Sequence, residues 1–374
     1  MYQRICTALR WLALLLLAVT FSWASQQSLC AQTGPPNLPP ATPPPSSSAP
    51  QQEGASIWIY VGAVVALGVI GAIIALVVLQ PNKSKKEPTL SYSSERLGDY
   101  RLLNLLMTGQ TSQVWEVAEI SSGRHFAIKM LLPECAKVAE HRRFLFHEAE
   151  VGQQLAHPNI IRVVRIVRDP NVPHFVMDFF PGGNLKLRIL RKEWDFIKEH
   201  AQEILKQAAT ALAFINAKGW VHRDVKPDNL LVSSSGETRV IDLAIAQRIP
   251  TGLAKIFRKK GKIQGTRSYM SPEQIRNEPL DGRADIYSFG ATCYEIVTGR
   301  PPFRGTSAQD LLNKHLTEKP ISPRVHNPEV TEEFAQLVLQ MLAKNKEHRP
   351  QSFHEVLMAL RKIRVFSAVK KSKT

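Results

Sequence analysis

The chain has 374 residues, and its 48 lysines and arginines exceed its 32 acidic residues to give a formal net charge of +16. The length allows one large domain with appendages. The first 80 residues carry two arginines and one glutamate, or +1, which leaves +15 on the remainder. This excess suits acidic proteins or anionic lipids, and because no nucleic-acid-binding motif is present we expect no nucleic-acid partner. The four cysteines lack the spacing of metal ligands, which argues against a zinc site and a disulfide framework.

The first 31 residues have the layout of a secretory signal peptide. Two arginines precede an apolar run over residues 11–21, and small residues follow near Ala24. Cleavage near Ala24 or Ala31 and retention as a signal anchor both remain open. Residues 32–56 are rich in proline and serine and predict an extended, disordered linker.

Residues 57–79 form an uncharged apolar run of 23 residues. At 1.5 Å per residue a helix over this run is about 35 Å long, enough to cross a bilayer. Lys83, Lys85 and Lys86 follow at once, so the positive-inside rule places the rest of the chain in the cytoplasm. We expect a cell-membrane protein with one span, or two if the first apolar run is retained.

The same run contains small residues at a spacing of four. The pairs are Gly62 and Ala66, Gly68 and Ala72, and Gly71 and Ala75. Such pairs let two membrane helices approach closely, so a homodimer is possible. Ordinary small residues of a membrane helix would give the same pattern.

The next segment, residues 80–98, predicts a polar juxtamembrane tether, and residues 99–365 predict the folded domain. Strand patterns at 100–106, 114–119 and 125–131 come first, and helical patterns dominate afterwards. Strands followed by helices predict an α+β domain. Residues 366–374 form a short basic tail.

A polar loop, 222–229, lies between two predicted rigid elements. A helical apolar pattern covers 201–215, and a short apolar strand follows at 230–232. Pro227 rules out a continuous helix through the loop. A second acid, Asp242, comes directly after the apolar pair Val240 and Ile241. A proton-accepting acid, a lysine, an amide and a second acid form the set that phosphoryl transfer requires.

The loop reads His-Arg-Asp-Val-Lys-Pro-Asp-Asn and resembles the catalytic loop of protein kinases, H-R-D-x-x-x-x-N. Lysine two residues after the first acid is similar to serine/threonine kinases. The resemblance covers about residues 99–365 and implies a two-lobed fold, with a small β-rich lobe and a large helical lobe. The overall layout is similar to bacterial membrane-anchored serine/threonine kinases of the eukaryotic-like type.

The resemblance implies roles for four residues of this region. Asp224 would accept the proton of the substrate hydroxyl, and Lys226 would stabilise the transferred phosphoryl group. Asn229 and Asp242 would bind Mg²⁺.

The resemblance also implies an ATP site. Lys129, in the segment Phe-Ala-Ile-Lys, would bind phosphates and pair with Glu148, with Glu150 as the alternative partner. Residues 107–114 stand where the family has a glycine-rich loop, but Met107 and Ser112 replace two of its three glycines. The other expected ATP-site residues are Gly109, Val114, Ala127, Met177, Asp178, Phe180 and Leu231; Asp178 and Phe180 would offer backbone groups to adenine.

Residues 265–273 resemble the segment that docks the protein substrate, with Thr266 in contact with it. Structural positions are also implied. Asp285 would lie under the catalytic loop, Arg349 would pair with Glu273, and Arg223 would contact the activation segment.

These features predict a membrane-tethered serine/threonine protein kinase that uses ATP and Mg²⁺ and acts on protein hydroxyls. A pseudokinase that serves as a binding or scaffolding module is the alternative, because the glycine loop is degenerate. The triplet at Asp242 also reads Asp-Leu-Ala instead of Asp-Phe-Gly, and Ala244 disfavours positive φ. A small-molecule kinase of the same fold is a further alternative, against which the intact 265–273 segment argues.

Overall fold

The structure is a computed structural model that describes residues 96–250 and 264–367. The chain divides into two compact units, Met1–Thr89 and Leu90–Thr374, and every described residue belongs to the second. The expected signal segment, linker, membrane span, most of the tether and most of the basic tail lie outside the described residues. Within 96–250 and 264–367, no helix combines the length and the apolar character that crossing a bilayer requires.

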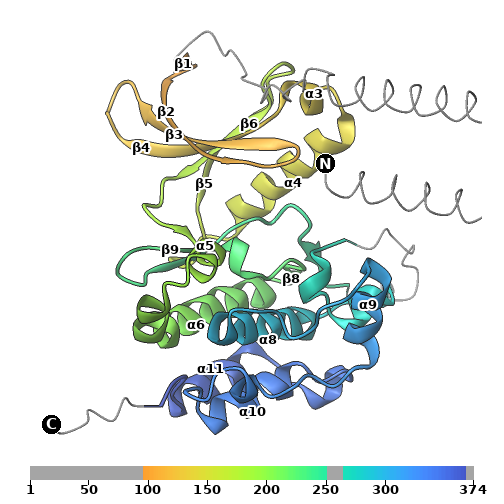
Figure 1. Ribbon diagram of the computed structural model, residues 1–374. Coiled ribbons are helices and arrows are strands. Elements are labelled where there is room, and N and C mark those ends of the chain that lie inside the picture. The colour runs from red at the N-terminus through yellow and green to blue at the C-terminus, as the bar shows by residue number, and fades with distance from the viewer. Residues whose placement is uncertain (1–95, 251–263, 368–374) are drawn as a thin grey trace, which may run out of the picture. The chain divides into compact units, whose positions relative to one another are not determined.

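The first lobe is a six-stranded antiparallel sheet with two helices (Figure 1). Its strands lie in the order β1-β2-β3-β4-β6-β5. The strands are β1 (Arg96–Leu97), β2 (Tyr100–Thr108), β3 (Ser112–Glu119), β4 (His125–Leu131), β5 (Val163–Val167) and β6 (His174–Asp178), and the helices are α3 (Pro133–Ala136) and α4 (Ala139–Gln154). One face of β4 packs its apolar residues on Tyr100 and Val176, and the other face packs towards α4.

The second lobe is mainly helical (Figure 1). Its α-helices are α5 (Leu185–Leu190), α6 (Trp194–Ala217), α7 (Pro272–Ile275), α8 (Gly282–Thr298), α9 (Ala308–Thr317), α10 (Glu332–Met341) and α11 (Phe353–Lys362). Short 3-10 helices are η1 (Pro227–Asn229), η3 (Arg267–Tyr269), η4 (Pro323–Val325) and η5 (Lys346–His348). The two-lobed kinase fold expected from the sequence is therefore confirmed.

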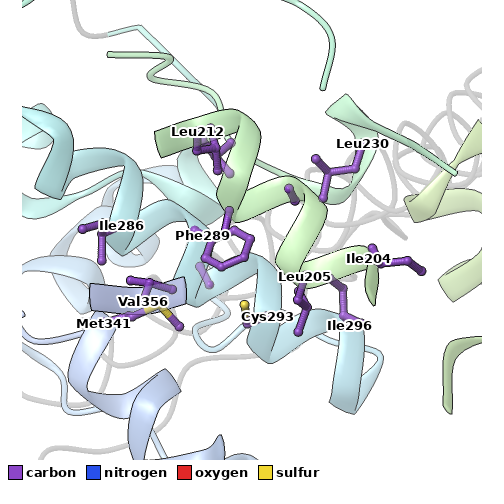
Figure 2. Close-up of a cluster of buried hydrophobic side chains, with 14 of the residues drawn as sticks. Ile204, Leu205, Leu212, Leu230, Ile286, Phe289, Cys293, Ile296, Met341 and Val356 are labelled. Carbon is purple, nitrogen blue, oxygen red and sulfur yellow. The ribbon is translucent and has the colours of Figure 1, made fainter. Parts of the chain in front are cut away.

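The core of the helical lobe forms around α6, which packs against α8 and α11. The apolar positions predicted between 201 and 215 are all buried, because a 3–4 spacing puts them on one helix face. Figure 2 shows Leu205 and Leu212 of α6 in the same cluster as Phe289 and Cys293 of α8 and Val356 of α11. Val225 and Leu230 belong to the same cluster, so this core supports the polar loop 222–229.

Short strand pairs frame the polar loop 222–229. β8 (Trp220–Val221) precedes the loop and pairs with β11 (Gln247–Arg248), while β9 (Leu230–Val232) follows it. β9 pairs with β10 (Thr238–Val240) and with β7 (Gly183–Asn184). Asp242 comes two residues after β10, so both ends of the loop and the second acid are fixed to small sheets.

Side-chain caps fix the helices that flank the loop. Asn184 Oδ1 accepts a hydrogen bond from Leu187 N (2.9 Å) at the start of α5. Ser271 and Gln274 form a reciprocal capping box on α7. Gly299 ends α8 in the left-handed region, with φ of 75°. These local signals fix where α5, α7 and α8 begin or end.

Candidate active site

The catalytic loop is held from below by the buried carboxylate of Asp285. Its oxygens accept hydrogen bonds from the backbone N–H groups of His222 (2.8 Å) and Arg223 (2.9 Å) and from the Asn216 amide (3.0 Å). Arg223 has φ of 71°, a conformation that non-glycine residues rarely adopt. Asp285 compensates for this strain, because its two oxygens accept the consecutive backbone N–H groups of His222 and Arg223.

Asp224, the expected base, lies at the centre of a compact polar group. Its Oδ2 accepts from Lys226 Nζ (2.6 Å) and its Oδ1 from Thr266 N (2.8 Å). Lys226 Nζ also donates to Thr266 Oγ1 (2.7 Å). Burial alone would raise the pKa of Asp224, but the Lys226 ammonium and the Thr266 hydrogen bonds outweigh it and hold the pKa below its ordinary value. The carboxylate is therefore ionised and oriented at neutral pH.

Asn229 and Asp242 present oxygen atoms near this group. The Asn229 amide nitrogen donates to Asp224 O (2.8 Å) and Oδ2 (3.2 Å), and no described residue donates to its Oδ1. Asn229 O accepts from Ile241 N (3.0 Å), which connects the loop to the segment that carries Asp242. Asp242 has φ of 67° and a side chain that is 33% exposed. The two residues thus offer an amide oxygen and a carboxylate on adjoining backbone segments.

The positive φ of this segment lies at Asp242 and not at the position of the missing glycine. Ala244 is absent from the described non-glycine residues with positive φ. Its N–H instead donates to Asp242 Oδ1 at 3.4 Å. Alanine therefore fits this conformation of the triplet without strain.

Lys129 on β4 pairs with Glu148 on α4. Lys129 Nζ lies 2.8 and 2.7 Å from the two Glu148 carboxylate oxygens and 4.0 Å from Asp242 Oδ1. Burial alone would lower the pKa of Lys129, but the two carboxylates outweigh it and raise the pKa, so the ammonium stays charged. The alternative partner, Glu150, pairs with Arg168 at the surface instead.

The expected phosphate- and adenine-binding side chains lie on one face of the sheet. Val114 is the cross-strand neighbour of Lys129 on one side and of Met107 on the other, and Ala127 is the neighbour of Met177. Cross-strand neighbours point to the same side, and residues two apart on one strand do as well. The five residues therefore share the face that carries the lysine–glutamate pair.

The connection between the lobes contains Asp178 and Phe180, the two residues expected to offer backbone groups to adenine. Asp178 N–H donates to Arg162 O (3.0 Å), and the Asp178 carboxylate pairs with the Arg162 guanidinium. The Asp178 N–H is therefore not available to a ligand. Phe180 O accepts from Gly182 N (2.8 Å), whereas Phe180 N–H has no partner within residues 96–250 and 264–367. Leu231, from the other lobe, lies half-buried on β9 opposite Asn184.

The loop between β2 and β3 is closed by backbone bonds despite its missing glycines. Gly109 N donates to Ser112 O (2.8 Å), and Leu132 N donates to Thr111 O (2.9 Å). The Met107 side chain is 46% exposed at the end of β2. Methionine at 107 is accommodated because its side chain is open to solvent, and the loop tip is anchored to the start of α3.

The docking segment is fixed at both ends. Arg349, fully buried, donates to both Glu273 oxygens (2.7 and 2.9 Å). Gln274 Nε2 donates to Arg223 O (2.9 Å). Gly265 has φ of 119°, and a Cβ there would lie 3.0 Å from Arg223 O, so glycine is required. The segment therefore passes directly beside the catalytic loop.

His147, which the sequence reasoning missed, joins α4 to the other lobe. Its Nε2 lies 2.8 Å from Ala246 O, and its ring meets that of Trp220 edge-on at 5.9 Å. The guanidinium of Arg248 also lies over the Trp220 ring, 4.6 Å from its centre. The only signal in the sequence for a role of His147 was its position next to Glu148. A histidine on an amphipathic helix is otherwise indistinguishable from a surface residue.

Comparison with known proteins agrees with this geometry. The family model described as the protein kinase domain matches residues 100–359. A probable serine/threonine-protein kinase of Streptomyces coelicolor is 32% identical over 264 residues, covering 69% of this chain and 39% of the relative. Serine/threonine-protein kinase PknB is 33% identical over 261 residues in Mycolicibacterium smegmatis (69% and 41%) and 32% identical over 272 residues in Mycobacterium tuberculosis (72% and 43%). The chain thus spans about two fifths of the length of these relatives. It belongs to the protein kinase family.

Proposed function

We propose that the protein transfers the γ-phosphate of ATP to serine and threonine hydroxyls of protein substrates. The observation that carries the proposal is the position of Asp224 between Lys226 and the Thr266 backbone. The site therefore combines an ionised acid, a cation and the segment expected to hold the substrate. The serine/threonine kinases among its relatives support the same activity.

The residues of the site have separate roles in the proposed transfer. Asp224 accepts the proton of the substrate hydroxyl as the oxygen attacks, a contribution of about 10²–10⁴ in rate. Lys226 stabilises the negative charge on the transferred group, and Lys129, held by Glu148, orients the phosphates that remain on the nucleotide. Because the supporting bonds already exist within the protein, little reorganisation is needed when substrates bind.

The donor set of Asn229 and Asp242 fits Mg²⁺. An amide oxygen and a carboxylate oxygen are hard ligands, and Mg²⁺ sites commonly use one or two protein groups together with water and phosphate oxygens. When bound, the ion would neutralise charge on the nucleotide phosphates. Asn229 is suited to this role because Asp224 engages its amide nitrogen, so that its oxygen is the atom left to bind a cation.

We also propose that residues 57–79 anchor the protein in the cell membrane, with the kinase domain in the cytoplasm. The length of the apolar run and the lysines after it support this topology. Extraction of the full chain by detergent but not by alkaline carbonate would support the anchor, and release by carbonate would contradict it. Crosslinking of the wild type and a Gly68→Ile/Ala72→Ile variant in membranes would test the homodimer.

The activity is tested by phosphate transfer from γ-labelled ATP by the full-length protein. Asp224→Asn should lower turnover at least about a hundredfold while nucleotide binding persists. Asp195→Asn, a change of the same kind at an exposed position on α6, is the matched control and should not affect turnover. Equal transfer by wild type and Asp224→Asn, or none by either, would favour the pseudokinase alternative.

A further inference from the structure

Arg267 follows the residue that touches both catalytic groups. Thr266 N donates to Asp224 (2.8 Å) and Thr266 Oγ1 accepts from Lys226 (2.7 Å). A peptide that brings a hydroxyl to Asp224 must therefore pass beside Thr266 and its neighbour. Arg267 is the first residue of η3, and its side chain is exposed. Substrate residues near the acceptor hydroxyl thus pass close to the backbone of an exposed arginine.

A buried acidic residue on the other flank, Glu295, is already engaged. Glu295, 2% exposed on α8, accepts hydrogen bonds from both Lys186 Nζ and Tyr269 Oη. A buried carboxylate that has a cation and a hydroxyl as partners is not available to a basic substrate side chain. A second acid, Asp228, is half-buried on η1, which packs against α5. Both of these acids therefore lie on the α5 side of the catalytic loop.

The α9 side, where Arg267 lies, has the opposite character. The 3-10 helix η3 packs against α9. The carboxylates of α9 and of the residue that follows it are used locally: Asp310 accepts from Thr306 N (2.8 Å), and Glu318 Oε2 lies 3.8 Å from Lys314 Nζ. Arg267 has no carboxylate partner in the described part of the chain. Its charge is therefore available to a bound peptide.

We propose that Arg267 selects protein segments that carry an aspartate or glutamate close to the acceptor serine or threonine. The selectivity rests on the proposed kinase function and adds the substrate class to it. An exposed ion pair changes the rate constant for substrate capture by about two- to fivefold. Because the pair is solvent-accessible, the preference should weaken as salt shortens the Debye length from about 10 Å at 0.1 M.

The test uses full-length protein and neutral peptides with one acceptor. Glutamate, glutamine or lysine is placed at each position up to three residues from the acceptor, and kcat/KM is measured for each peptide. The wild type should prefer glutamate over glutamine about two- to fivefold on one side of the acceptor. Arg267→Glu should convert this into a preference for lysine at the same positions. Arg276→Glu makes the same charge change at an exposed position after α7 and should keep the wild-type ratio.

The outcomes separate the selectivity from the activity. If Arg267→Glu retains the wild-type ratio of glutamate to glutamine peptides, the inference is wrong. If that variant is inactive, Arg267→Gln decides: loss of the preference supports the inference, and its retention overturns it. Wild-type transfer without any charge preference would overturn the selectivity and leave the kinase function standing. No transfer to any peptide would overturn both.

Discussion

Replacing Arg349 with methionine should destabilise the kinase domain more than any surface charge change. The arginine side chain is 0% exposed and donates to both oxygens of Glu273, which is 4% exposed. It also donates to the backbone oxygens of Ala343 (2.8 Å), Arg283 (2.8 Å) and Lys344 (3.1 Å). Methionine keeps most of the volume but leaves a carboxylate buried without a counter-charge.

The expected cost follows from this burial. Removing one partner of a buried ion pair costs about 3–5 kcal/mol, because the remaining charge is uncompensated. For a domain of this size, each 1 kcal/mol lowers the melting temperature by about 2–4 °C, so the loss should be roughly 6–20 °C. Lys198→Met, which removes an exposed partner of Glu329, should cost less than about 1 kcal/mol.

Thermal unfolding of the full chain, monitored with a probe of the kinase domain, measures the loss of stability in Arg349→Met and in Lys198→Met. The double variant Glu273→Gln/Arg349→Met removes both charges and should be less destabilised than the sum of the single variants. A loss below 1 kcal/mol for Arg349→Met, or strict additivity of the two changes, would refute the assignment of a buried, coupled pair. The kinase activity of Arg349→Met should fall in parallel, because Glu273 anchors the docking segment.

Three further predictions concern the site and the pH dependence. Glu148→Gln should lower kcat/KM for ATP at least tenfold, because Lys129 loses its charged partner, while Glu150→Gln should be close to wild type; similar losses in both would contradict the assigned pair. His147→Ala should lower kcat more than it raises KM for ATP. His147→Gln can still donate to Ala246 O and should therefore recover part of the lost kcat; equal kcat values for the two variants would count against the hydrogen bond. Burial and Lys344 lower the pKa of His315 to about 3. Below about pH 6.5 the imidazole therefore binds a proton in the unfolded chain but stays neutral in the folded chain. This difference lowers the free energy of unfolding by about 1.4 kcal/mol per pH unit. Between pH 6 and 5, His315→Gln should flatten the decline in stability measured by denaturant unfolding, and the exposed His354→Gln should not; an unchanged slope in His315→Gln would disprove the mechanism.

Sequence patterns predicted the elements that depend on local chemistry. The strand at 125–131 and the strand at 230–232 have the observed bounds, because alternating or continuous apolar residues end at polar ones. The pairing of Lys129 with Glu148 instead of Glu150 was also expected, since the two glutamates lie on different faces of α4. These features follow from periodicity over one element.

Contacts between distant elements could not be read in the same way. Lys186 and Glu295 are separated by 109 residues, and His147 and Ala246 by 99. Periodicity shows which face of a helix is buried but not which group of another element meets it. The sequence likewise did not show which residue of the Asp242–Ala244 triplet has a positive φ. That residue is Asp242, and the segment that carries it is bonded to the distant catalytic loop through Ile241 N and Asn229 O.

The position of Trp220 has a practical consequence. The residue is 7% exposed, and its ring lies against the imidazole of His147 on α4 and the guanidinium of Arg248 on β11. Indole emission responds to neighbouring charge and to water, so an outward movement of α4 would change the signal of this tryptophan directly. The protein therefore contains a native optical reporter at the junction of the two lobes. Mutating the other described tryptophans, Trp115 and Trp194, would make the emission of Trp220 easier to observe. No external dye would need to be attached.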